Sequence, residues 1–120
     1  MTRSKRTNPD FLNGVPELVL LQLLARQPMY GYELVQAIRR TTGDRLDFGE
    51  GCIYPILHRL EREGILHSRR EEAGGRSRIV YRVTAKGQKR LGESAALWRQ
   101  ITEAIGTVLQ GGVDARPSVA

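Results

Sequence analysis

The feature that most constrains the fold is a change of hydrophobic period at Gly64. Before it, apolar residues recur at three- and four-residue steps, the spacing of one helix face: Ile53, Ile56, Leu57 and Leu60. After Gly64, the segment 65–70 alternates with the two-residue period of a strand. Glycine is common where helices end, so the pattern predicts a helix from residue 51 that stops at Gly64 and leads directly into a strand.

A second alternating segment, 78–84, follows the first strand after a turn. The turn, 71–76, contains Gly74 and Gly75, which relieve the backbone restrictions at the tip of a hairpin. Two short strands joined in this way predict a β-hairpin. Four arginines would cluster around its tip: Arg69, Arg70, Arg76 and Arg78.

Two helices are predicted before residue 51. Pro16 suits the first turn of a strongly apolar helix, and Pro28 ends it. The segment 30–40 has the spacing of a second helix with one inner apolar face. The segment 46–48 is long enough only for a single short strand.

The last helix is predicted over residues 85–109, with Thr84 as its N-cap. Apolar and small residues along it alternate in steps of three and four, a period of about 3.5 residues that is typical of a coiled-coil seam. Such a seam outside a small core indicates pairing with a second copy of the chain. We therefore expect these residues to form a dimer interface: Leu91, Trp98, Ile101, Ile105 and Val108.

These elements together predict a mainly α-helical fold with a small β-hairpin, namely a winged helix-turn-helix plus a long C-terminal dimerisation helix. Residues 15–84 would form the DNA-binding domain, and residues 85–109 the dimerisation helix. Residues 1–14 would be a flexible basic arm, which either contacts DNA or is a solvated terminus. Residues 110–120 would be a disordered tail.

The charge of the chain indicates a polyanionic partner. Nineteen basic and thirteen acidic residues give a net charge of +6 and a pI near 10.1, which favours nucleic acid or an anionic membrane surface. The longest apolar block, 18–25, is too short to span a bilayer, and the N-terminus has no signal-peptide pattern. A single cysteine excludes an intrachain disulfide. We therefore expect a cytoplasmic protein with no membrane partner.

Three segments carry a resemblance to a known family: M-Y-G-Y-E-L (29–34), G-C-I-Y-P-I-L-H-R-L-E-R-E-G-I-L (51–66) and R-I-V-Y-R-V-T-A-K-G (78–87). Their order and spacing resemble those of the PadR-like transcriptional regulators, over about residues 15–109. The resemblance implies a homodimeric bacterial repressor that binds an inverted-repeat operator and is released by a small-molecule effector. The single C-terminal helix is similar to that of the shorter subfamily. Cys52 stands where such proteins more often carry Thr or Ser.

The helix over 51–64 would present its polar face to DNA. The family motif implies that Tyr54 contacts DNA, and its hydroxyl would donate to a phosphate. Pro55 in the first turn would press against a thymine methyl. His58 and Arg59 would reach bases or phosphate, and Arg62 the backbone. A solvated charged helix face is the alternative.

The hairpin tip is the second expected DNA contact. Arg76 and Arg78 would enter the neighbouring minor groove or hold its phosphates. Glu71 and Glu72 complicate this expectation, because they can pair with the same arginines in the free protein.

Trp98 and Cys52 each have two interpretations. Trp98 is either interfacial packing or, as the resemblance to multidrug-binding members implies, part of an effector site that sandwiches a planar aromatic or hydrophobic molecule between subunits. Cys52 lies at a predicted helix N-terminus, where the dipole lowers the pKa of a thiol. It is either a redox switch or a passive small residue.

The sequence contains no catalytic constellation, no phosphate-cradling glycine loop and no metal-ligand spacing, so we expect neither an enzyme, a cofactor nor a metal. The expected partners are double-stranded DNA, a second copy of the chain and an effector. Two other functions fit the same pattern. One is a winged helix that binds another protein, and the other is an architectural protein that binds DNA of any sequence.

Overall fold

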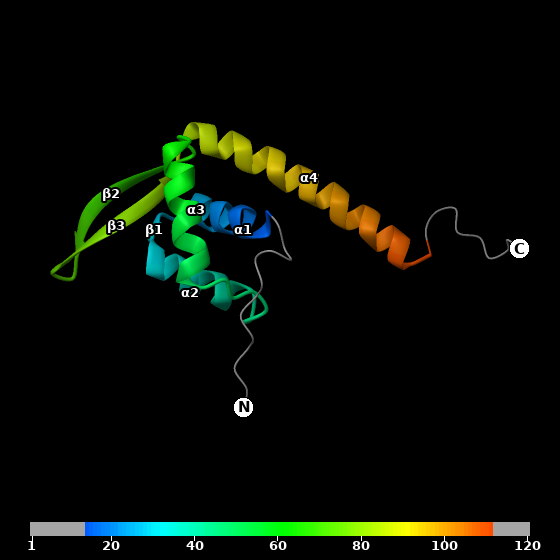
Figure 1. Ribbon diagram of the computed structural model, residues 1–120, viewed down its shortest axis with the longest axis horizontal. Helices are drawn as coiled ribbons and strands as arrows, with labels where there is room; N and C mark the ends of the chain where they lie inside the picture. The colour runs from blue at the N-terminus through cyan, green and yellow to red at the C-terminus, as the bar shows by residue number, and fades with distance from the viewer. Residues whose placement is uncertain (1–13, 112–120) are drawn as a thin grey trace, which may run out of the picture.

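The computed structural model describes residues 14–111, so the expected tail from residue 112 onward and all but the last residue of the expected arm lie outside the described residues. Within these residues, four helices and three strands follow one another (Figure 1). Their bounds are α1 Val15–Arg26, β1 Met29–Tyr30, α2 Gly31–Thr41, α3 Glu50–Arg62, β2 Leu66–Ala73, β3 Arg76–Val83 and α4 Ala85–Leu109. The fold is a winged helix with a long C-terminal helix, as predicted.

The core lies between α1, α2, α3 and the inner end of the sheet. The largest fully buried side chains are Leu20, Leu21, Leu24, Leu34, Ile38, Ile53, Leu57, Leu60, Ile65 and Leu66. Helix α1 buries residues on several sides because both α2 and α4 pack against it. This explains why its sequence is apolar with little one-sided pattern.

Helix α3 begins one residue earlier than predicted. Glu50 is its first residue, so Pro55 lies inside the helix rather than in the first turn. Proline has no N–H, so it leaves the Gly51 carbonyl without its helical donor. Both residues are exposed, and water can satisfy that carbonyl. Gly64, at φ 77°, ends the helix as predicted.

The short strand is found at a different place from the one predicted. Residues 46–48 are not a strand, and Asp47 and Phe48 are buried as part of the loop before α3. Met29 and Tyr30 instead form β1, which pairs with Tyr81 and Val80 of β3. A strand needs a neighbour, and the edge of β3 is occupied by β1.

The hairpin is longer than predicted. Gly74 and Gly75 alone form its turn, with φ of 58° and 78°, and left-handed conformations at both central residues are required by a tight two-residue turn. The strands therefore extend to the tip, and Glu71 and Glu72 lie within β2, opposite Arg78 and Ser77. The sheet order is β1-β3-β2. We call the β2–β3 hairpin the wing.

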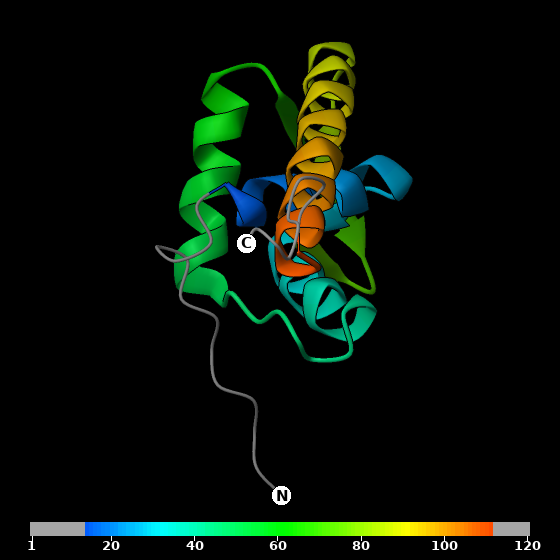
Figure 2. The ribbon, with the colours of Figure 1, turned by 90° about the vertical axis from the view of Figure 1, so that its right-hand side faces the viewer.

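Helix α4 has the predicted bounds, and Thr84 caps it by accepting a hydrogen bond from the Gly87 N–H at 3.0 Å. Its first half packs against α1, and its second half extends away from the other helices (Figures 1 and 2). Leu91, expected at the dimer seam, is buried in the core of its own subunit at 7% exposure. The seam thus has a covered part and an exposed part.

Candidate nucleic-acid interface

Helix α3 has three distinct faces. Ile53, Leu57 and Leu60 point into the core. The opposite face presents Pro55, His58 and Arg62, which are all exposed. These three residues follow at steps of three and four, so they lie in one row along the helix. The structure therefore places three of the expected DNA-binding residues together on open surface.

One flank of this row meets the wing. Tyr54 and His58 lie side by side, with ring centroids 6.1 Å apart. The Arg78 guanidinium lies 4.2 Å from the centroid of the Tyr30 ring, which is close enough for a cation–π interaction. A cleft of about 440 Å³ separates α3 from the base of the wing, and it is lined by Tyr30, Gly31, Tyr32, Tyr54, His58, Arg78, Ile79 and Tyr81. It combines hydroxyl, imidazole and guanidinium donors, which suit phosphate oxygens.

Tyr54 is fixed in this cleft by its contact with the first residue of α2. A Cβ atom on Gly31 would overlap the Tyr54 hydroxyl and ring. Burial raises the pKa of the Tyr54 phenol, and the negative charge of Glu50 adds to the effect. A phenol is protonated at neutral pH, and the raised pKa extends this to higher pH, so the O–H can donate to a phosphate.

Two cleft residues were missed by the sequence analysis. Tyr30 and Tyr32 lie in the segment 30–40 that was predicted only as a helix, yet both line the cleft beside Tyr54. Tyr32 is largely exposed and accepts a hydrogen bond from Gln36 at 3.0 Å. Their place at the N-terminus of α2 was the available signal, because a helix N-terminus attracts phosphate.

Arg59 is separated from the other expected DNA-binding residues. It lies on the flank of α3 that faces α1 and α4, where Nη2 donates to Glu17 Oε1 at 2.9 Å and Nη1 meets Glu63 Oε2 at 3.4 Å. The hydrogen bond to Glu17 is the main reason that its pKa is raised further. Its guanidinium is thus already occupied within the subunit. By contrast, Arg62 forms no ion pair with any residue from 14 to 111.

Arg76 and Arg78 of the wing are not paired with the neighbouring Glu71. Glu71 pairs instead with Arg82 at 2.9 Å and Arg69 at 3.4 Å. Arg76 at the tip makes no ion pair within the described part of the chain. Arg78 lies over the Tyr30 ring and makes no ion pair with any residue from 14 to 111. Both positive charges therefore remain available to an anionic partner.

Cys52 differs from the expectation for a helix N-terminus. Burial raises the pKa of its thiol above the ordinary value. The thiol is half-buried against the core and lies on the flank of α3 away from the wing. This favours the passive role over the redox switch, because a protonated thiol is a poor nucleophile.

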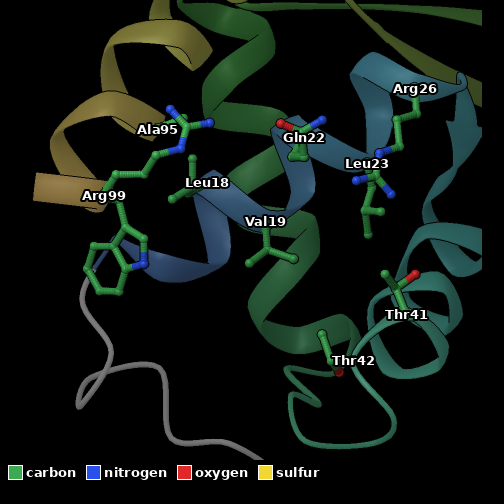
Figure 3. A pocket seen from close by; sticks show the side chains of 10 residues that line it. Leu18, Val19, Gln22, Leu23, Arg26, Thr41, Thr42, Ala95 and Arg99 are labelled. Atoms are coloured by element: carbon green, nitrogen blue, oxygen red, sulfur yellow. The ribbon is translucent and has the colours of Figure 1, made fainter. Parts of the chain in front are cut away.

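Trp98 lies where α4 passes over α1. A cleft of about 330 Å³ opens beside it, lined by Leu18, Val19, Gln22, Leu23, Arg26, Thr41, Thr42, Ala95, Trp98 and Arg99 (Figure 3). A second cleft, of about 240 Å³, lies on the other side of the indole near Ile101 and the start of α1. The indole remains 39% exposed. Beyond it, Ile101, Ile105 and Val108 are exposed on the same face of α4.

Two negative observations concern residues 14–111 alone. This part of the chain contains no group of three or more His, Cys, Asp or Glu side chains arranged to hold a metal ion. None of its helices combines the length and the apolar character that crossing a membrane requires.

The sequence of the chain matches those of known transcriptional regulators. A model of the transcriptional regulator PadR-like family matches residues 20–93. The transcriptional regulator Rv3488 of Mycobacterium tuberculosis is 37% identical over 84 residues, which cover 70% of this chain and 76% of that protein. The transcriptional regulator YqjI of Escherichia coli is 35% identical over 95 residues. That match covers 79% of this chain but 44% of YqjI, so the chain spans less than half of that regulator.

Solved structures agree with these matches. A transcriptional regulator from Clostridium thermocellum superposes with a TM-score of 0.75 at 28% identity, over 84% of this chain and 96% of that one. A PadR-like regulator from Bacillus cereus also gives 0.75, at 29% identity, over 85% and 98% of the two chains. These relatives are transcriptional regulators rather than enzymes. By sequence and by fold, this chain belongs to the PadR-like family of transcriptional regulators.

Proposed function

We propose that the chain is a homodimeric, cytoplasmic repressor that binds an inverted-repeat operator. The observation that carries the proposal is the exposed row on α3 beside a wing whose Arg76 and Arg78 charges have no carboxylate partner among residues 14–111. Helix α3 would enter the major groove with Pro55 and His58 at the base edges. Tyr54, Arg62 and the two wing arginines would hold phosphates or the adjacent minor groove.

The exposed half of α4 supports the dimer. Its apolar residues, which we call the α4 stripe, are Leu97, Trp98, Ile101, Ile105, Val108 and Leu109. Burying such a row against the same row of a second subunit is the usual outcome for a helix with this spacing. Two subunits would then present their α3 helices to successive major grooves, about 34 Å apart.

The cleft beside Trp98 supports release by an effector. Its volume of about 330 Å³ is at the lower end of the range for small-molecule sites, and apolar side chains line it with Arg26 and Arg99 among them. A planar aromatic molecule there would contact both α1 and α4, and so would favour one arrangement of the two helices. Titration with a panel of planar aromatic compounds should quench Trp98 fluorescence. A panel without any response would favour simple packing of the indole.

Selection of DNA from a random duplex library tests the main proposal. The protein should enrich an inverted repeat, and its affinity for that duplex should fall steeply with salt. Reporter expression from a promoter that contains the repeat should decrease when the protein is present. Equal binding to every sequence would favour an architectural role instead, and absence of DNA binding would favour a protein-binding winged helix.

A further inference from the structure

Four charged side chains from three helices form a closed ring beside the recognition helix. We call Glu17 of α1, Arg59 of α3, Glu63 at the end of α3 and Arg90 of α4 the charge ring. Glu17 lies 2.9 Å from Arg59 and 3.3 Å from Arg90. Glu63 lies 3.4 Å from each of the same two arginines.

Each carboxylate oxygen and each terminal guanidinium nitrogen of the ring takes part in one of the four ion pairs. Each carboxylate directs one oxygen to Arg59 and the other to Arg90. Each guanidinium directs Nη2 to Glu17 and Nη1 to Glu63. Two positive and two negative charges therefore cancel in one closed arrangement. The planar guanidinium suits this geometry, since its nitrogens are held in a fixed fork.

Glu17 is the most buried member of the ring. Its side chain is 18% exposed, whereas those of Arg59, Glu63 and Arg90 are 38–40% exposed. A largely buried carboxylate that lost an arginine would keep its charge with less compensation. Both arginines therefore pair with a largely buried carboxylate of α1, which holds their guanidinium groups next to that helix.

A separate set of contacts joins the end of α3 to the start of α4. Thr84 Oγ1 donates to the Gly64 carbonyl at 2.6 Å, and Lys86 Nζ donates to the Glu63 carbonyl at 2.9 Å. Gly87 lies against the Ile65 carbonyl so closely that a Cβ atom would overlap it. These contacts fix the point at which the two helices meet. The angle between the helices depends in addition on contacts further along each one, which include the packing of α4 on α1.

The charge ring supplies a contact of this kind that joins α3 and α4 through α1. Arg59 lies one turn before the end of α3, and Arg90 lies about one turn beyond Lys86 in α4. We infer that the charge ring sets the angle between α3 and α4, so that Arg59 and Arg90 are positioning residues for operator recognition rather than DNA contacts. This inference rests on the proposed function, because the angle matters when two α3 helices must meet two half-sites together.

The experiment compares one half-site with two. The probes are the duplex enriched by the wild-type protein, versions with one or two base pairs inserted at its centre, and a duplex that carries a single half-site. The variants are Arg59→Gln, Arg90→Gln and, as the matched contact control, Arg62→Gln. Simultaneous binding of two half-sites adds about 10²–10⁴-fold in affinity when the geometry permits it.

Arg59→Gln and Arg90→Gln should each keep wild-type affinity for the half-site and an unchanged salt dependence. Both variants should bind the complete operator with an affinity about tenfold or more below that of the wild type. Inserted base pairs should reduce their affinity less than they reduce that of the wild type. Arg62→Gln should instead weaken binding to both probes. It should also reduce the slope of log affinity against log salt concentration by about one unit, as the loss of one phosphate contact requires. The double variant of Arg59 and Arg90 should be no worse than either single variant.

Two outcomes on DNA would overturn the inference. One is a loss for Arg59→Gln that matches Arg62→Gln on the half-site and in salt slope, which would make Arg59 a DNA contact. The other is wild-type behaviour of both ring variants on every probe.

A measurement without DNA separates the inference from the proposed function. Spin labels on Arg62→Cys and Glu103→Cys, in a Cys52→Ser background and diluted with unlabelled protein, report the distance between α3 and α4. The distribution should be narrow with the ring intact and broader after Arg59→Gln. Equal widths would refute the inference even if the protein enriched no DNA sequence.

Discussion

The winged-helix head and the second half of α4 are similarly rich in apolar residues but use them differently. In the head, Leu20, Leu57 and Leu60 are fully buried within one subunit. On α4, Val108 and Leu109 are 72% and 80% exposed in the same subunit. Trp98 lies near the boundary between the two regions. The comparison teaches that one chain completes the core of the head but leaves the α4 stripe exposed.

The largest expected effect tests the head. Leu57→Ala should lower the free energy of unfolding by about 2–5 kcal/mol, because it removes a fully buried side chain and leaves a cavity. Urea unfolding followed by circular dichroism measures the loss. The loss should be the same at low and high protein concentration, since Leu57 packs within its own subunit. A concentration-dependent loss would contradict the assignment of Leu57 to the core of a single chain.

The next effect tests the α4 stripe. Ile105→Asp should convert the dimer to a monomer, because each subunit loses about 1.5–3 kcal/mol of side-chain burial and gains a charge at the interface. Sedimentation velocity measures the association, and far-ultraviolet circular dichroism should show an intact head. Thr107→Asp is the matched control, since it adds the same charge on the other side of α4. Dissociation by both variants, or by neither, would remove the distinction between the two sides of the helix.

A smaller effect is expected where α2 meets Tyr54 in the head. Gly31→Ala should cost about 1–3 kcal/mol of unfolding free energy, because the added methyl overlaps the Tyr54 side chain. Gly51→Ala is the control, because nothing lies within 4 Å of the added atom and alanine favours a helix. Thermal unfolding compares the two variants. Combining Gly31→Ala with Tyr54→Ala should restore part of the loss, and additive losses would argue against this contact.

The smallest effect concerns Cys52 at the edge of the head. Burial raises the pKa of its thiol, so below that pKa a smaller fraction is thiolate than in an unfolded chain. Alkylation by iodoacetamide at pH 8 should therefore be slower in the native protein than in urea. The difference should shrink as the pH rises through the folded pKa. Faster alkylation of the native protein would revive the redox-switch interpretation.

Local patterns in the sequence were sufficient for most of the fold. The helical spacing up to Leu60 and the glycine at position 64 predicted both α3 and its end. Thr84 predicted the start of α4, because capping depends on residues within one turn. The alternation around Gly74 and Gly75 predicted the hairpin, although the strands reach closer to the tip than expected.

Long-range contacts account for what the sequence did not predict. Strand β1 has two residues, and it exists because Tyr81 and Val80 lie beside it in space. Leu91 shares the seam spacing with Ile105, yet α1 covers one and not the other. Arg59 is a residue type expected at a DNA contact, but its guanidinium donates to Glu17, which lies 42 residues earlier in the chain. Spacing along one helix cannot distinguish these cases.

The shortness of β1 has a consequence for the solubility of the free protein. It pairs with β3 only at Val80 and Tyr81, so the outer edge of the wing is uncovered from Arg76 to Ile79 within the described chain. Open strand edges invite edge-to-edge aggregation, and charged side chains on them oppose it. Arg76 and Arg78 therefore keep two wings from joining into a continuous sheet when no DNA is bound. Their replacement by valine or isoleucine would favour self-association of the wing.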